Sequence, residues 1–190
     1  LHLAIKCNGH SAHAARPWLG DNPLERLVDA VSRLRKDFDS LSINKDHWHP
    51  TCTLTILKTP NQTVNCIPSE AEGALDVRFP APYTTKEILH RICNLLGDEI
   101  DTHTIMSAEP TRFTPDLLYL SVSEEITGKS TIQNKEDGGS DARFIGQHNI
   151  PVIVSRPIVG ELHSLDEWID INSMETFYRI YELYLKRKLL

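Results

Sequence analysis

Segments with the apolar spacing of a strand and segments with the apolar spacing of a helix follow one another along the first 108 residues. Their order constrains the fold more than any other feature of the sequence. Apolar residues alternate with other residues in 1–8 and in 71–79, as in half-buried strands. Residues 51–59, which are rich in Thr, Leu and Ile, and residues 100–107 are also interpreted as strands. Apolar residues recur at helical spacing in residues 22–38 and in the segment that ends near Gly97. The predicted element order is therefore βαββαβ.

The ends of the two predicted helices carry the expected signals. Asn22 is a candidate N-cap and Pro23 suits the first helical position, while Thr84 or Thr85 can cap the second helix before it ends near Gly97. The order βαββαβ is typical of an α+β ferredoxin-like sandwich, in which two helices cover one face of a four-stranded antiparallel sheet. We expect residues 1–108 to fold as one domain.

Residues 109–190 show a different pattern. We predict a helix from Thr114-Pro115 to about Thr127, a short strand at 130–133, a short helix at 141–147, a buried parallel strand at 151–155 and a closing helix capped by Ser173. The closing helix needs a sheet to cover one apolar face, made of Phe177, Ile180, Tyr181 and Tyr184. Two short strands make a poor core. We therefore expect 109–190 to be part of a larger α/β domain into which 1–108 is inserted.

Composition narrows the class of protein. The 190 residues are 40% hydrophobic and 24% charged, with a formal net charge of −6, which predicts a soluble globular chain without a nucleic-acid partner. No apolar run is long enough to span a membrane, and residues 1–9 do not resemble a signal peptide, so we expect a cytoplasmic protein without a membrane partner. We interpret the four cysteines as reduced thiols rather than as a disulfide framework: Cys7, Cys52, Cys66 and Cys93.

Two segments within residues 1–108 carry polar groups suited to a binding site. Small residues surround His13 in a loop between a strand and a helix, so its imidazole can reach beyond its own domain; a solvent-exposed loop histidine is the alternative. Asn65 precedes a proline-containing turn, and Arg78 ends a strand with a guanidinium fork that matches a carboxylate. A turn asparagine and a surface ion pair explain the same two residues.

Two further segments lie within residues 109–190. Residues 137–144 place Gly138, Gly139 and Ser140 before a short helix, where backbone N–H groups can hold an anionic or carbonyl oxygen; a helix-capping turn is the alternative. His163 follows the predicted parallel strand, where α/β folds place their active sites, and neutral imidazole is a good zinc ligand. One ligand alone holds no metal.

Two other groupings are interpreted as surface features. His47, His49 and Cys52 could be drawn as a zinc site, but their spacing fits no standard zinc finger. The adjacent pair Glu124-Glu125 falls within a helical pattern and is typical of a solvated helix face.

Together and in this order, the four segments resemble the dinuclear zinc peptidase family that includes aminoacylase, acetylornithine deacetylase, succinyl-diaminopimelate desuccinylase and several dipeptidases. The resemblance implies that residues 1–108 are the lid or dimerisation domain and that 109–190 are the carboxyl-terminal part of a catalytic domain. It further implies a homodimer, formed through the lid, that uses two zinc ions. The implied reaction is hydrolysis of an amide bond in an N-acyl amino acid or dipeptide-like substrate that carries a carboxylate.

The same resemblance assigns roles to individual residues. His13 would enter the active site of the partner subunit and stabilise the oxyanion, Asn65 and Arg78 would hold a substrate carboxylate or carbonyl, and His163 would ligate one zinc ion. The substrate-binding loop would comprise Gly138, Gly139 and Ser140, supported by Arg143. Other family motifs precede the lid and have no counterpart in this sequence: a His-x-Asp segment, a metal-bridging Asp and a Glu-Glu pair. We therefore expect this chain alone to bind zinc weakly or not at all and to be inactive.

Three other functions were weighed. A non-catalytic dimerisation or binding module would share the same sandwich and stays open. An RNA-binding module would need exposed aromatic residues on the central strands and a basic face, neither of which is evident. A serine hydrolase is disfavoured because the sequence has no G-x-S-x-G segment. The sequence does not name the substrate.

Overall fold

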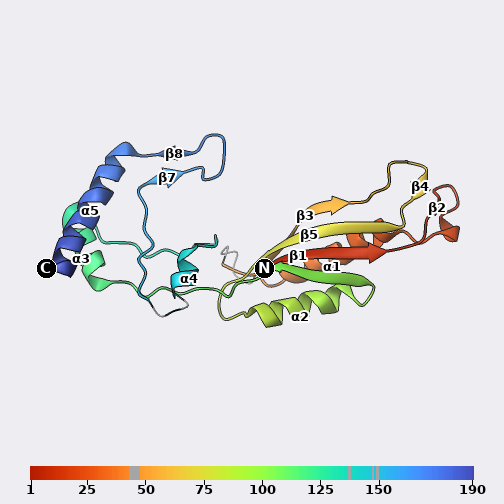
Figure 1. The fold of residues 1–190 in the computed structure, drawn as a ribbon, viewed down its shortest axis with the longest axis horizontal. Coiled ribbons are helices and arrows are strands. Elements are labelled where there is room, and N and C mark those ends of the chain that lie inside the picture. The colour runs from red at the N-terminus through yellow and green to blue at the C-terminus, as the bar shows by residue number, and fades with distance from the viewer. Residues whose placement is uncertain (43–47, 137, 147, 149) are drawn as a thin grey trace. The chain divides into compact units, whose positions relative to one another are not determined.

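The computed structural model describes residues 1–42, 48–136, 138–146, 148 and 150–190 (Figure 1). The chain divides into two compact units, Leu1–Pro110 and Thr111–Leu190. Among the described residues, no helix has the length and apolar character needed to cross a membrane.

The first unit is built on a four-stranded antiparallel sheet with the strand order β3-β5-β1-β6. Its strands are β1 (His2–Asn8), β3 (Thr51–Lys58), β5 (Glu70–Arg78) and β6 (Ile100–Met106). Two helices, α1 (Pro23–Asp39) and α2 (Thr85–Leu96), cover one face of the sheet (Figure 1). This arrangement confirms the predicted ferredoxin-like sandwich.

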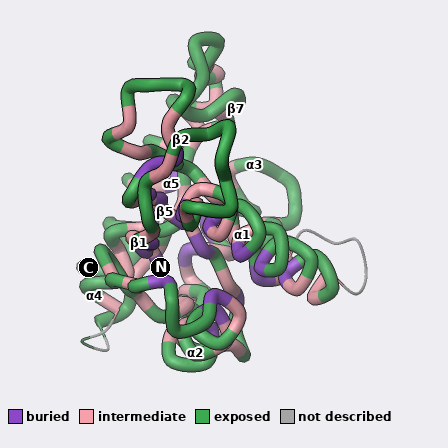
Figure 2. Tube along the Cα trace, turned by 90° about the vertical axis from the view of Figure 1, so that its right-hand side faces the viewer, coloured by how far each residue is buried: buried purple, intermediate pink, exposed green. Residues whose placement is uncertain are grey.

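The core of the first unit follows directly from the alternating pattern. Every second residue of β1 and β5 faces the helices and is buried, and Leu3 lies opposite Leu75 at the centre of the sheet. Buried stretches also recur along the inner faces of α1 and α2 (Figure 2). The main members of this core are Leu3, Ile5, Cys7, Leu27, Leu34, Leu75, Val77, Ile88 and Ile92.

The helix ends also agree with the sequence. The Asn22 side chain accepts a hydrogen bond from the N–H of Leu24 at 3.2 Å, with Pro23 in the first helical position. Thr84, rather than Thr85, caps α2 through a reciprocal capping box with Glu87. Gly97 ends α2 with a φ of 81°, a conformation that glycine adopts without strain.

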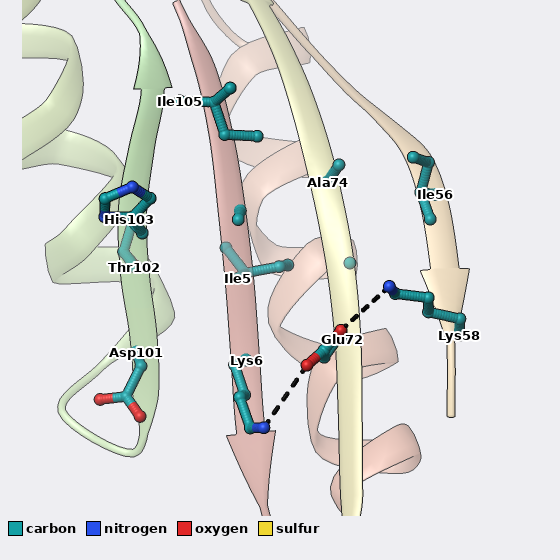
Figure 3. A pocket seen from close by; sticks show the side chains of 12 residues that line it. Ile5, Lys6, Ile56, Lys58, Glu72, Ala74, Asp101, Thr102, His103 and Ile105 are labelled. Carbon is teal, nitrogen blue, oxygen red and sulfur yellow. Dashed lines mark hydrogen bonds and ion pairs between the residues drawn. The ribbon is translucent and has the colours of Figure 1, made fainter. Parts of the chain in front are cut away.

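The opposite face of the sheet is not covered by the two helices and carries both charged and exposed apolar side chains. Lys6 on β1 binds Glu72 on β5 at 3.4 Å, and Glu72 also binds Lys58 on β3 at 3.1 Å (Figure 3). These two lysines lower the pKa of the Glu72 carboxyl through their hydrogen bonds and charges. The shallow hollow on this face, about 480 Å³ in volume, has Ala74 on its floor and Ile56 on one side.

A small two-stranded sheet lies beyond the end of β1, and the sequence did not predict it. It pairs β2 (Ala12–His13) with β4 (Cys66–Ile67), and the short 3-10 helix η1 (Pro17–Leu19) packs beside it. Strands of two residues are too short to show a period in the sequence. We call residues 10–20 and 64–67 the β2–β4 tip.

The second unit is organised around two packed helices, α3 (Leu117–Thr127) and α5 (Ile171–Leu189). The Tyr119 ring meets the rings of Tyr181 and Tyr184 edge-on, with centroids 5.4 and 5.5 Å apart. Ile180 and Tyr184 are buried here, so within the described residues the apolar face of the closing helix packs on α3 and not on the predicted sheet. The unit also contains α4 (Ala142–Gly146) and a hairpin of β7 (Val159–Gly160) and β8 (Trp168–Ile169).

Three predictions for the second unit were wrong. Residues 130–133 and 151–155 do not form strands, because the described part of this unit places no strand beside them to accept their backbone hydrogen bonds. The hairpin β7–β8 was missed. Ser173 does not cap α5: Asp170 does, and its carboxylate accepts a hydrogen bond from the N–H of Ser173 at 2.9 Å.

Replacing Leu75 tests the sandwich core. Leu75 is 2% exposed at the centre of β5, so Leu75→Ala should lower the free energy of unfolding of this unit by about 2–5 kcal/mol through lost burial and the cavity left behind. Native-state hydrogen exchange of the β5 amides in the 190-residue chain measures this loss. Leu57→Ala on β3, where the leucine is 41% exposed, is the control and should cost much less. Equal losses for the two variants would contradict this core.

Candidate active-site residues

Backbone hydrogen bonds fix the β2–β4 tip to the end of the sandwich. His13 lies directly opposite Cys66 in the antiparallel pair, and the N–H of Ala14 donates to the carbonyl of Asn65 at 2.9 Å. His10 and Asp21 exchange two backbone hydrogen bonds, each 2.9 Å long. The tip is therefore held in place although most of its side chains are exposed.

Two glycines allow this close packing. A Cβ atom on Gly9 would overlap the carbonyl oxygen of Asp21, and one on Gly20 would lie 2.7 Å from the Cβ of Ala12. Real Cβ atoms do not approach other atoms so closely, so a side chain at either position would displace the tip.

The orientation of the His13 imidazole is set within the tip. The side chain is exposed, and its Nδ1 accepts a hydrogen bond from the N–H of Ala15 at 3.1 Å. In a neutral imidazole the nitrogen that accepts carries no proton, so the proton is on Nε2. The Nε2–H of the neutral His13 imidazole takes no part in this hydrogen bond, so it can donate to another acceptor.

The structure brings Asn65 together with His13. Asn65 is exposed in the turn before β4, and its backbone carbonyl is bonded to the residue that follows His13. The side chain of Asn61 holds this turn by donating to the carbonyls of Thr63 and Cys66, each at 2.9 Å. The sequence analysis missed this positioning role of Asn61, although an Asn after Pro60 is a known turn signal.

Arg78 lies at the other end of β5. The first residue of that strand, Glu70, pairs with Asn8 next to the tip, and Arg78 is eight residues further on, which corresponds to about 27 Å along an extended strand. Within one chain, Arg78 is therefore not brought together with His13 and Asn65.

The Arg78 guanidinium already has a carboxylate partner. Its Nε and Nη2 donate to the two oxygens of Asp76 at 2.6 and 2.8 Å. This hydrogen-bonded pair lowers the pKa of the Asp76 carboxyl, with a further contribution from the charge of His2, and raises the pKa of Arg78. The surface ion pair weighed as an alternative is the arrangement found.

Burial, together with the charge of Asp76, also raises the pKa of the Cys52 thiol to about 12.

The glycine loop of the second unit forms a helix-capping turn. The Ser140 hydroxyl accepts a hydrogen bond from the N–H of Ala142 at 3.2 Å, and its carbonyl accepts one from the N–H of Arg143 at 3.1 Å. Gly138 and Gly139 are exposed, and Asp137 lies outside the described residues. The Arg143 guanidinium lies over the ring of Phe144, 4.6 Å from its centroid.

His163 is exposed in the loop between β7 and β8. The prediction that it follows a buried parallel strand was wrong, because residues 151–155 do not form a strand and the hairpin that flanks His163 is antiparallel. Its φ of 66° is in the left-handed region, as is the φ of 51° at Glu161, and such values are uncommon for residues with a side chain.

The residues present do not by themselves make a zinc site. Across the described ranges, no three His, Cys, Asp or Glu side chains are close enough together to hold a metal ion. His163 offers the right donor chemistry for one zinc position and no more. His47 lies outside the described residues, so the grouping with His49 and Cys52 is not described. All four cysteines are free, as predicted.

Comparison with known proteins identifies the family. Residues 1–104 match the family model of the M20 peptidase dimerisation domain. The chain belongs to the M20 peptidase family. The first unit is accordingly an M20 dimerisation domain, as the resemblance implied.

Individual M20 relatives match along almost the whole chain. The succinyl-diaminopimelate desuccinylase of Thioalkalivibrio sulfidiphilus is 27% identical over 197 residues, which cover 100% of this chain and 52% of that protein. The desuccinylase of Rhodospirillum centenum is 28% identical, with 98% and 50% covered. The chain thus spans about half the length of these relatives.

Solved structures share the fold. A tripeptidase from Staphylococcus aureus matches with a TM-score of 0.75 and 16% identity, covering 97% of this chain and 51% of that one. An M20 family metallo-carboxypeptidase from Sulfolobus solfataricus matches with a TM-score of 0.65 and 15% identity, covering 97% and 57%.

The ion pair at Arg78 can be tested by titration. Arg78→Gln should raise the pKa of Asp76 toward the usual carboxyl value of about 3.9, because the hydrogen-bond donors and the positive charge are removed. NMR titration of the carboxyl carbons measures this shift. Because the folded-state pKa is lowered, the pair stabilises the fold fully above about pH 4 and less as the pH falls through the folded value.

The stability difference between wild type and Arg78→Gln should therefore shrink in acid. Arg35→Gln, which removes an exposed partner of Asp39 on α1, is the control and should leave Asp76 unchanged. An Asp76 pKa that does not move in Arg78→Gln would show that the pair does not form in solution.

Proposed function

We propose that the protein containing this chain is a zinc-dependent amide hydrolase that acts, as a homodimer, on N-acyl amino acids or dipeptide-like substrates with a carboxylate. Membership of the M20 peptidase family supports the reaction class. The observation that carries the proposal for this chain is the exposed His13 imidazole, whose Nδ1 accepts the N–H of Ala15 and which, when neutral, keeps Nε2–H as a donor.

Zinc would supply the activated water and polarise the amide carbonyl. His163 would be one ligand, and we propose that the remaining ligands belong to sequence that this chain does not span. The relatives, which are about twice as long, leave room for them. The 190-residue chain alone would then bind zinc weakly and hydrolyse nothing.

His13 would act on the oxygen of the scissile carbonyl. As the water attacks, negative charge develops on that oxygen, and a donor that is already oriented stabilises the charge without reorganisation. Removing one such donor typically costs about 3–4 kcal/mol of transition-state stabilisation. Asn65, held beside His13 by the bonded turn, would contact the same substrate through its carboxamide.

The separation between His13 and Arg78 favours a site shared by two subunits. About 27 Å of strand lies between the tip and Arg78, so one small substrate cannot contact both in a single chain. Two copies remove this difficulty, because the tip of one can meet the Arg78 end of the other. The glycine loop with Ser140 and Arg143 would then line the substrate site of the second unit.

The edge strand β3 offers a means of dimerisation through the first unit. It lies at one edge of the sheet, and its exposed side chains include Ile56 at 52% and Leu57 at 41%. An edge strand has unpaired backbone groups that can bond to the same strand of a second copy.

One observation favours a second candidate, a non-catalytic dimerisation or binding module. The dimerisation-domain model matches residues 1–104, which are more than half of this chain. In that case the full-length protein would dimerise but hydrolyse none of these substrates, and replacing His13 would change no rate.

Substituting His13 tests the oxyanion role. In the full-length protein, His13→Ala should lower kcat by about 10²–10³-fold and change KM little, because the lost interaction forms mainly in the transition state. Steady-state kinetics with an N-acyl amino acid measures both constants. His10→Ala, on the same exposed tip, is the control and should stay near wild type. A change confined to KM in His13→Ala would contradict the oxyanion role.

Mixing two inactive variants tests the shared site. A dimer of one His13→Ala chain and one His163→Ala chain keeps both histidines at one of its two sites if the tip acts on the partner subunit. After subunit exchange, activity should return to roughly a quarter of the wild-type level. Mixtures that remain inactive, although mass spectrometry confirms exchange, would place His13 and His163 in the site of the same chain.

A further inference from the structure

The β2–β4 tip is free of acidic residues although the chain is acidic overall. The whole sequence has 26 Asp and Glu against 20 Lys and Arg, whereas residues 10–20 and 64–67 contain no Asp or Glu. With its histidines neutral, the tip carries one formal charge, that of Arg16. The positive sign of this charge favours an anion.

Arg16 is the exception among the six arginines of the first unit. The other five use their guanidinium groups within the unit, four of them with carboxylates and one with a backbone carbonyl: Arg26 with Asp21 and Glu99, Arg35 with Asp39, Arg78 with Asp76, Arg91 with Asp37, and Arg33 with the carbonyl of Leu95. For Arg16, which is exposed, the described residues provide no carboxylate or carbonyl partner.

The backbone holds Arg16 close to His13. The N–H of Arg16 donates to the carbonyl of His13 at 2.8 Å, and the carbonyl of Arg16 accepts a hydrogen bond from the N–H of Leu19 at 3.1 Å. Arg16 thus ends the tight turn that begins at His13 and leads directly into η1. A guanidinium in this position is a planar fork of donors within side-chain reach of whatever His13 contacts.

We propose that Arg16 binds a carboxylate of the substrate close to the scissile amide and so selects anionic substrates. The inference rests on the proposed function, because it takes the molecule bound by His13 to be an amide substrate. Two carboxylates would meet the requirement, one on the acyl group and the α-carboxylate of the amino acid. Arg78 of one chain and Arg16 of its partner would then give the shared site two separate carboxylate positions.

Three substrates of the full-length protein separate these sources. The first is an N-succinyl amino acid, the second is its N-butanoyl analogue without the acyl carboxylate, and the third is the N-succinyl amino acid amide without the α-carboxylate. Arg16→Gln should lower kcat/KM by about 10–100-fold, mainly through KM, for every substrate that retains the contacted carboxylate. Arg35→Gln, an equally conservative change at an exposed arginine of α1, is the control and should leave all three unchanged.

The pattern of losses identifies the contact. A loss that disappears with the butanoyl analogue assigns Arg16 to the acyl carboxylate, and one that disappears with the amide assigns it to the α-carboxylate. Equal losses for all three substrates, or no loss, overturn the proposal.

A binding measurement distinguishes failure of this inference from failure of the proposed function. Succinate added to the full-length protein should shift the NMR signal of the Arg16 Nε–H, and Arg35→Gln should not alter that shift. If wild type hydrolyses none of the amides while the succinate shift is present, the amidase proposal fails and the anion site stands. The absence of a succinate shift at Arg16 overturns the inference whatever the activity.

Discussion

The antiparallel register of β1 with β5 is the constraint on which the rest of the first unit depends. Leu3 opposite Leu75 places the apolar residues of both strands on the helix-covered face, and a slip by one residue would turn them to the open face. The same register sets Asn8 against Glu70 at one end and His2 against Asp76 at the other. It therefore decides which polar groups lie at each end of the sandwich.

The two ends of the sheet are chemically different as a consequence. At the end next to Asn8 and Glu70, the segment that follows β1 and the segment that precedes β5 together form the β2–β4 tip. The tip itself contains no Asp or Glu. At the other end, Asp76 is directly beside His2, with the imidazole Nε2 at 3.3 Å, and also binds Arg78. The two ends of the sandwich thus carry two different arginines. Arg16, at the tip, has no carboxylate partner among the described residues, and Arg78, a strand length away, is paired with Asp76.

Much of the first unit could be predicted because its signals are local. The alternation in β5 and the Asn22 and Thr84 caps each lie within a few residues. The β5 strand and the Asn22 cap were predicted correctly, and Thr84 was one of two candidates for the cap of α2. The second unit was predicted less well because a strand depends on a partner far away in the sequence. Residues 151–155 have the apolar run of a buried strand but no neighbouring strand in the described part of the unit. The cap of α5 was misplaced because Asp170 and Ser173 are both good cap residues three positions apart.

The sequence identified the candidate site residues, but it could not give the tautomer or the ion pairing of their side chains. It could not show that Ala15 binds Nδ1 of His13 and so leaves the proton on Nε2. The pairing of Arg78 was in principle readable, because residues two apart on a strand share a face. That pairing changes what Arg78 can contribute. A substrate carboxylate must displace Asp76 from Arg78. The displaced Asp76 carboxylate is then left with His2 and solvent, so binding at Arg78 gains only the difference in free energy between two ion pairs. Arg16 has no such competitor among the described residues, and a carboxylate there exchanges only water.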